Sequence, residues 1–111
     1  MVGQTCVIGD NRDHITALIV LETAPAEGFA AQRGIQAATI PELAAHPDIR
    51  AEVMRHVQAV NERVSAAEQI LAFKILPAEW TVEGEELTPT LKIRRAAIEH
   101  KYAEEIQAMY A

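Results

Sequence analysis

Two short apolar runs near the start of the chain predict a pair of β-strands. Residues 4–8 and 14–21 are rich in β-branched side chains, and the five residues 9–13 between them include glycine, asparagine and aspartate. This order of segments is typical of a β-hairpin. The second run is apolar at successive positions, which indicates a strand that is buried on both faces. We therefore expect helices on both sides of the sheet.

Start and stop signals for two short helices come next along the chain. Pro25 suits the first turn of a helix and Gly34 suits the position just past its end, so we expect a helix over about 25–33. Thr39 and Glu42 have the spacing of a capping box, in which two side chains and two backbone N–H groups bond reciprocally. This spacing predicts a second, shorter helix.

The most regular apolar pattern lies in the middle of the chain. Apolar residues recur there at the spacings of three and four that place them on one face of a helix, and Asp48 is expected to cap that helix. The stripe consists of Ile49, Val53, Val57, Val60, Val64, Ala67 and Leu71. The pattern predicts one long helix with an apolar face in the core. A coiled coil, which would need a partner helix, is the weaker alternative.

The last third of the chain predicts a strand, a loop and a helix. Residues 72–76 predict a third strand, which Trp80 and Val82 continue as an extended piece, and residues 94–110 predict the last helix. The fold class is therefore α+β, a small sheet of about three strands made from an amino-terminal hairpin and a later strand, with helices packed on both faces. The topology of the third strand stays open.

Composition limits the number of domains and the classes of function. The chain has 111 residues, enough for a single domain over 1–111, with a net charge of −6 and one cysteine, Cys6. An acidic chain is a poor general binder of nucleic acid, because phosphates are bound by clustered Lys and Arg. One cysteine excludes an internal disulfide and a cysteine-based zinc site, and we expect Cys6 in the core and no metal site. No apolar run is long enough for a membrane span and no signal peptide is recognised, so we expect a cytoplasmic domain.

The segment 83–95 holds the candidate chemistry. Gly84 lies between acidic residues and predicts a turn. Thr88, Pro89 and Thr90 predict a stiff, extended backbone, because proline fixes its own φ and keeps the residue before it out of the helical region.

Three cations follow this stiffened piece. Lys92, Arg94 and Arg95 place three positive charges in four residues of an otherwise acidic chain. A lysine at the end of a stiff loop can be directed at an anion. Composition by itself would make the segment an ordinary solvated loop.

The order Leu-Thr-Pro-Thr-Leu-Lys at 87–92 resembles the last conserved motif of the long-chain acyl-CoA synthetases, also called long-chain fatty acid–CoA ligases. These are AMP-forming, adenylating enzymes. A glycine precedes the motif, and Arg95 and Lys101-Tyr102 follow it at matching places. The likeness extends to Val-Ile-Gly-Asp at 7–10, which is similar to the hairpin of the family, and to the helical region 25–72, which is similar to an insert of its long-chain members.

The resemblance implies that the chain is the mobile C-terminal domain of such a ligase, without the N-terminal domain and the hinge, and inactive alone. Lys92 would be the catalytic lysine for the ATP-dependent adenylation of a fatty acid, after which the domain would rotate and allow the thioester with coenzyme A to form. Substrate or nucleotide contacts are implied for Thr90, Arg94 and Arg95, and a turn for Gly84, Thr88 and Pro89. The partner would be the N-terminal adenylating domain, which would make most of the contacts with ATP and Mg²⁺. The resemblance is also compatible with a parent enzyme that lies peripherally on the inner face of the membrane.

Two other hypotheses stay open. The chain could be a stand-alone interaction domain without catalysis that binds a partner helix through its valine stripe. It could also be regulatory, with Lys92 as a target for acetylation. This is compatible with the ligase hypothesis, because acetylation would remove the cation that adenylation uses.

Overall fold

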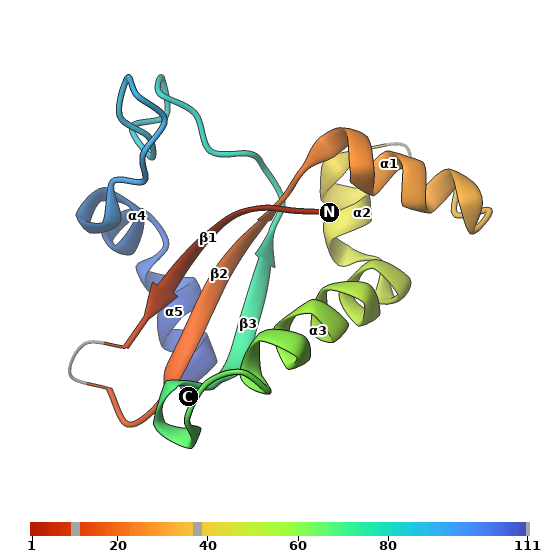
Figure 1. The fold of residues 1–111 in the computed structure, drawn as a ribbon. Helices are drawn as coiled ribbons and strands as arrows, with labels where there is room; N and C mark the ends of the chain where they lie inside the picture. The colour runs from red at the N-terminus through yellow and green to blue at the C-terminus, as the bar shows by residue number, and fades with distance from the viewer. Residues whose placement is uncertain (10–11, 37–38, 111) are drawn as a thin grey trace.

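A three-stranded sheet lies at the centre of the molecule, with helices on both of its sides (Figure 1). The computed structural model describes residues 1–9, 12–36 and 39–110. Positions 10 and 11 of the predicted turn, with the aspartate of the Val-Ile-Gly-Asp segment, lie outside the described residues. The fold class is α+β, as the pattern of the sequence predicts.

The strands are β1 (Val2–Ile8), β2 (Ile15–Leu21) and β3 (Ile70–Leu76), and their order in the sheet is β1-β2-β3. β1 and β2 pair antiparallel, which confirms the predicted hairpin. β2 and β3 pair parallel, which supplies the topology that the sequence left open. A parallel pair needs a crossover connection, and the helical segment between these strands provides it.

That crossover contains α1 (Thr23–Gln32), α2 (Ile40–Ala45) and α3 (Pro47–Asn61). α1 ends before Gly34, whose φ of 67° lies in the left-handed region that favours glycine. The start of α2 is capped as predicted, because Thr39 Oγ1 accepts the backbone N–H of the residue three positions on, at 3.3 Å.

The predicted long helix is wrong in its second half. α3 ends at Asn61, and the side-chain amide of Asn61 accepts the backbone N–H of Ile70 at 2.8 Å and donates to its carbonyl oxygen at 2.9 Å. These two bonds connect the end of α3 to the start of β3, so the chain turns back instead of continuing the helix. Val60 and Leu71 are 51% and 63% exposed, and the buried stripe ends at Val57.

Smaller corrections concern where other predicted helices and strands begin and end. His46, not Asp48, caps α3, and its Nδ1 accepts the Asp48 N–H at 3.1 Å. Val82 lies in a turn and does not prolong β3, because the Glu85 N–H donates to its carbonyl oxygen at 3.0 Å. The predicted last helix is two helices, α4 (Arg95–Lys101) and α5 (Ala103–Tyr110), separated where Tyr102 leaves helical geometry with φ −108°.

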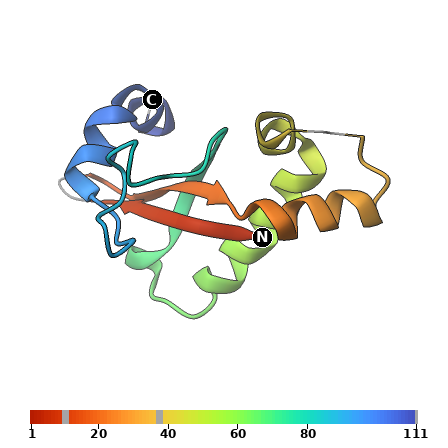
Figure 2. The ribbon, with the colours of Figure 1, turned by 90° about the horizontal axis from the view of Figure 1, so that it is seen from above.

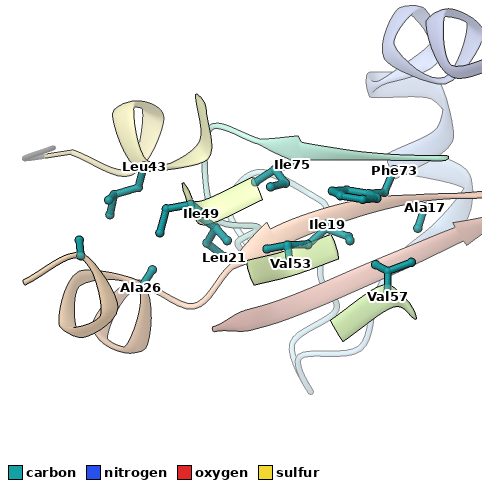
Figure 3. Packing of buried hydrophobic residues seen from close by; sticks show 11 residues of the cluster. Ala17, Ile19, Leu21, Ala26, Leu43, Ile49, Val53, Val57, Phe73 and Ile75 are labelled. Carbon is teal, nitrogen blue, oxygen red and sulfur yellow. The ribbon is translucent and has the colours of Figure 1, made fainter. Parts of the chain in front are cut away.

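The sheet separates two apolar clusters. Figure 2 shows from above that α1, α2 and α3 lie apart from α4 and α5, with the sheet between them. The first cluster lies against α1, α2 and α3, and in Figure 3 the side chains of α3 point toward those of β2 and β3. The second lies against α4, α5 and the loop between β3 and α4, and it contains Cys6 as expected. β2 contributes side chains to both clusters, which confirms a strand buried on both faces with helices on both sides. No helix in the described ranges has the length and apolar character of a membrane span.

Candidate functional site

Residues 87–93 form a tight hairpin that carries Lys92, here called the Lys92 hairpin. Leu87 and Ile93 pair at its base as an isolated antiparallel bridge. Inside the hairpin the Thr88 N–H donates to the Lys92 carbonyl oxygen at 2.8 Å. Figure 1 shows this part of the chain projecting from the body of the molecule above α4.

The backbone at Thr88, Pro89 and Thr90 turns, so the predicted extended conformation is wrong. The Leu91 N–H donates to the Thr88 carbonyl oxygen at 2.8 Å, which places Pro89 at the second position of a β-turn. The fixed φ of proline suits that position as well as it suits an extended strand. Leu91 then takes a left-handed φ of 65°, which brings the chain back to the base of the hairpin.

Thr88 of the motif holds the backbone of the lysine. Thr88 Oγ1 accepts the Lys92 N–H at 3.1 Å and lies 3.1 Å from Thr90 Oγ1. Both the N–H and the carbonyl oxygen of Lys92 therefore bond to Thr88. The base of the lysine side chain is held in place, while its four-carbon stem remains exposed.

The three cations of the segment have different surroundings. Among the described residues no carboxylate forms an ion pair with Lys92 or Arg94, so both charges are available to an anion. Arg95 instead reaches β1, where its guanidinium donates to the Val7 carbonyl oxygen and lies 3.6 Å from Cys6 Sγ. Burial raises the pKa of the Cys6 thiol, so it stays protonated beside this cation. Within the described ranges, no three His, Cys, Asp or Glu residues gather as a metal site would need.

Gly84 lies in a turn just before the hairpin. Its N–H donates to Thr81 Oγ1 at 2.8 Å. A Cβ at this position would lie 2.9 Å from Thr81 Oγ1 and would collide with Oε1 of Glu86. The glycine thus leaves the space that the Glu86 carboxylate occupies.

Glu86 is the buried charge of this region, and it is not among the site residues predicted from the sequence. Its Oε1 accepts the Thr81 N–H at 3.0 Å, its Oε2 accepts from Lys101 Nζ, and its backbone carbonyl oxygen accepts the Arg94 N–H at 2.8 Å. Burial by itself would raise the pKa of Glu86, but the hydrogen bonds from Lys101 and Thr81, with the charge of Lys101, hold it below its usual value. No spacing rule connects positions 86 and 101, so the only signal was an acidic residue directly before the motif.

The model of the AMP-binding enzyme C-terminal domain family matches residues 1–111. A Mycobacterium tuberculosis protein that carries the name fatty-acid–CoA ligase fadD11 is 41% identical to the chain over 111 residues, which are 100% of this chain and 19% of that protein. The long-chain-fatty-acid–CoA ligase FadD15 of the same organism is 38% identical over 111 residues, which are 99% of this chain and 18% of that protein. The chain thus spans about a fifth of the length of these relatives.

Solved structures share the fold. The A-PCP didomain of carboxylic acid reductase from Segniliparus rugosus, in complex with AMP, superposes with a TM-score of 0.71 at 20% identity over 98% of this chain and 14% of that chain. The adenylation domain of a carboxylate reductase from Mycobacterium chelonae superposes with a TM-score of 0.65 at 23% identity, over 98% of this chain and 15% of that chain.

Proposed function

The chain belongs to the AMP-binding enzyme C-terminal domain family, and from this we propose that it acts as the mobile C-terminal domain of a long-chain fatty acid–CoA ligase. In this role it brings Lys92 to a fatty acid and ATP, and it rotates away before coenzyme A reacts. The observation that supports the proposal most is the Lys92 hairpin, which holds the lysine backbone at two points and leaves its charge unpaired among the described residues.

The chemistry of the first step explains why a lysine is needed. The fatty acid carboxylate attacks the α-phosphate of ATP, the bond to the β-phosphate breaks, and pyrophosphate leaves while an acyl-adenylate forms. Two anions must approach each other and charge increases on the phosphate oxygens, so a positioned cation lowers the barrier. The ammonium of Lys92 is a compact charge with three donors, which can contact both the carboxylate and a phosphate oxygen.

The neighbouring residues have supporting roles in this proposal. Arg94 is exposed next to the hairpin and can contact a phosphate of ATP or of coenzyme A. Thr90 orders the hairpin through Thr88, and its hydroxyl can donate to a substrate when Thr88 is the donor between the two threonines. Arg95 joins the start of α4 to β1 and contributes to the field of positive charge.

The second step needs the lysine to leave. The sulfur of coenzyme A attacks the acyl carbon and AMP leaves, and this requires access that a lysine at the carboxylate would block. A rotation of the whole domain on its N-terminal partner provides this access, and such domain movements often limit turnover. ATP and Mg²⁺ would be held mainly by the N-terminal adenylating domain. We place the ligase in the cytoplasm, where a peripheral contact with the membrane would supply fatty acid.

The interaction-domain hypothesis finds less support. The stripe that would bind a partner helix is used inside the domain, because Ile49, Val53 and Val57 are buried against the sheet. What remains exposed of the stripe, such as Val60, lies beyond that buried part.

The test uses the full-length ligase with Lys92→Ala, and it measures the two half-reactions separately. Fatty-acid-dependent exchange between ATP and pyrophosphate should fall about 10²- to 10³-fold, the usual loss for one electrostatic contact to the transition state. Thioester formation from supplied acyl-adenylate and coenzyme A should persist. Lys74→Ala, which removes another exposed lysine on β3, is the matched control.

Exchange that survives in Lys92→Ala would contradict the proposal. A fall in both half-reactions together, with a lower Tm, would instead show that the substitution damages the fold.

A further inference from the structure

We propose that the ion pair between Glu86 and Lys101 positions the Lys92 hairpin for adenylation without contacting substrate. This inference rests on the proposed role of Lys92. Both residues lie outside the Lys92 hairpin, and neither is needed to supply the charge that the reaction uses. In this proposal, Glu86 and Lys101 determine where the charge of Lys92 is held.

Glu86 joins three segments at the base of the hairpin. One carboxylate oxygen binds the Thr81 N–H, on the segment that comes from β3, and the other binds Lys101 at the end of α4. The Glu86 carbonyl oxygen binds the Arg94 N–H, on the segment that leaves the hairpin. The residue therefore connects both sides of the hairpin base to a helix of the body.

At its base the hairpin is held by apolar packing of Leu87 and Ile93 in the second cluster, which fixes its place but not its direction. It contains one bridge, between Leu87 and Ile93, and short paired segments of this kind are only marginally stable alone. Lys92 follows within six positions of Glu86 along the chain. A tilt at the base would therefore be carried to the lysine, and a misplacement of about 1 Å can cost about 10²-fold in rate.

The local structure is shaped around this carboxylate. The Glu86 side chain is 4% exposed, although Lys101 is 50% exposed. The space for it exists because position 84 has no Cβ. Ion pairs with a buried partner often contribute no more to stability than apolar residues of the same size would, and in some proteins they instead specify one geometry. A positioning role would explain why the charged side chain of Glu86, and not an apolar one, occupies this buried place.

The experiment compares Glu86→Gln and Lys101→Met in the full-length ligase. Each should lower kcat for ATP–pyrophosphate exchange about 10- to 100-fold and leave the KM for ATP and fatty acid unchanged, since a misplaced lysine weakens the transition state and not substrate binding. Thioester formation from supplied acyl-adenylate should stay within about twofold of the wild type. Lys101→Arg, which keeps the charge and a donor, should recover most of the loss.

Two further comparisons separate positioning from general stability. The double variant should lose no more than the more severe single variant, because the two residues act as one contact. In a Lys92→Ala background, Glu86→Gln should cause no further loss of exchange. Glu83→Gln, an exposed acid nearby, is the control and should behave as the wild type. A melting curve is measured for every variant to check that it folds. If Glu86→Gln does not fold, Lys101→Met tests the positioning role in its place.

The outcomes distinguish this inference from the proposed function. If both single variants keep normal exchange while Lys92→Ala loses it, the positioning role is overturned and the role of Lys92 stands. The positioning role is also overturned if both half-reactions fall equally, or if Glu86→Gln lowers the residual rate of Lys92→Ala. Normal exchange in Lys92→Ala would overturn the proposed function itself.

Discussion

The two faces of the sheet differ in where their directional polar contacts lie. On the face of α1, α2 and α3, Ile49 and Val53 are fully buried in an apolar cluster, and polar contacts such as those of Asn61 with Ile70 lie at the end of a helix. On the face of α4 and α5, an apolar cluster is joined by directional polar contacts. Glu86 pairs with Lys101 there, and the single hydrogen of the Tyr110 hydroxyl is shared between two backbone carbonyl oxygens, at 2.7 and 3.1 Å.

This difference matches what each face has to do. Apolar packing stabilises a fold without a preferred direction, so it keeps the crossover helices on the sheet. Hydrogen bonds and ion pairs depend on distance and angle, so they can set the direction of an exposed segment. In the proposed function, the first face would keep the domain rigid while it rotates, and the second would hold Lys92 in position.

The largest effect on stability should come from the apolar face. Ile49→Ala removes a fully buried side chain between α3 and the sheet, and such truncations cost about 2–5 kcal/mol in the free energy of unfolding. Urea unfolding of the 111-residue chain, followed by the fluorescence of its one tryptophan, Trp80, would measure the loss. Trp80 belongs to the opposite cluster, so a fluorescence transition that coincides with circular dichroism would show that both faces unfold together.

Val60→Ala is the matched control on the same helix. Val60 continues the apolar spacing but is 51% exposed, so its truncation should change the free energy of unfolding by no more than about 0.5 kcal/mol. A loss as large as that of Ile49→Ala would show that the stripe is buried beyond Val57, against the structure.

Sequence periodicity predicted the apolar face correctly as far as Val57. The stripe from Ile49 to Val57 is buried as expected, because helical spacing and burial follow from the same geometry. The prediction failed after Asn61, where apolar residues happen to continue the spacing. The helix ends there because the Asn61 amide bonds to the backbone of Ile70, a contact between residues nine apart that no local pattern reveals.

The next effect should appear on the polar face and depend on pH. Glu86→Gln keeps the shape of the side chain but removes its charge. At neutral pH it should lower the free energy of unfolding by about 1–2 kcal/mol, a modest value for a charged hydrogen bond because Lys101 is half exposed. Melting temperatures of both proteins from acid to neutral pH would measure the difference.

The direction of the pH dependence follows from the lowered pKa of the Glu86 carboxyl group. The pKa of Glu86 is lower in the folded chain than in the unfolded chain, so the stabilisation is complete above the ordinary value of about 4.3 and is lost as the pH falls through the folded value. The hydrogen bond to Glu86 raises the pKa of Lys101, so this contribution is also lost as the pH rises through the folded value of Lys101. A difference between the two proteins that stays constant at acid pH would contradict the ion pair.

The candidate site was predictable only in part. The motif identified the segment and singled out Lys92, but it did not show the hairpin, because proline suits both a turn and an extended chain. Glu86 and its pairing with Lys101 were not predicted, for a different reason. They are fifteen positions apart, and their pairing depends on how α4 packs against the loop. The different path of Arg95, toward β1, depends on the same packing.

The smallest expected effect concerns the turn of the Lys92 hairpin itself. Leu91 has a left-handed φ of 65° and is 64% exposed, so its side chain adds strain and little packing. Leu91→Gly removes a steric cost of about 1–2 kcal/mol and adds about 0.5–1 kcal/mol of chain entropy to the unfolded state. We therefore expect a gain of about 1 kcal/mol or less, measured as a higher urea midpoint with an unchanged slope. Leu91→Val, which is β-branched and fits this φ worse, should lower the midpoint, and the opposite order of the two variants would show that the left-handed turn is not the conformation of the hairpin in solution.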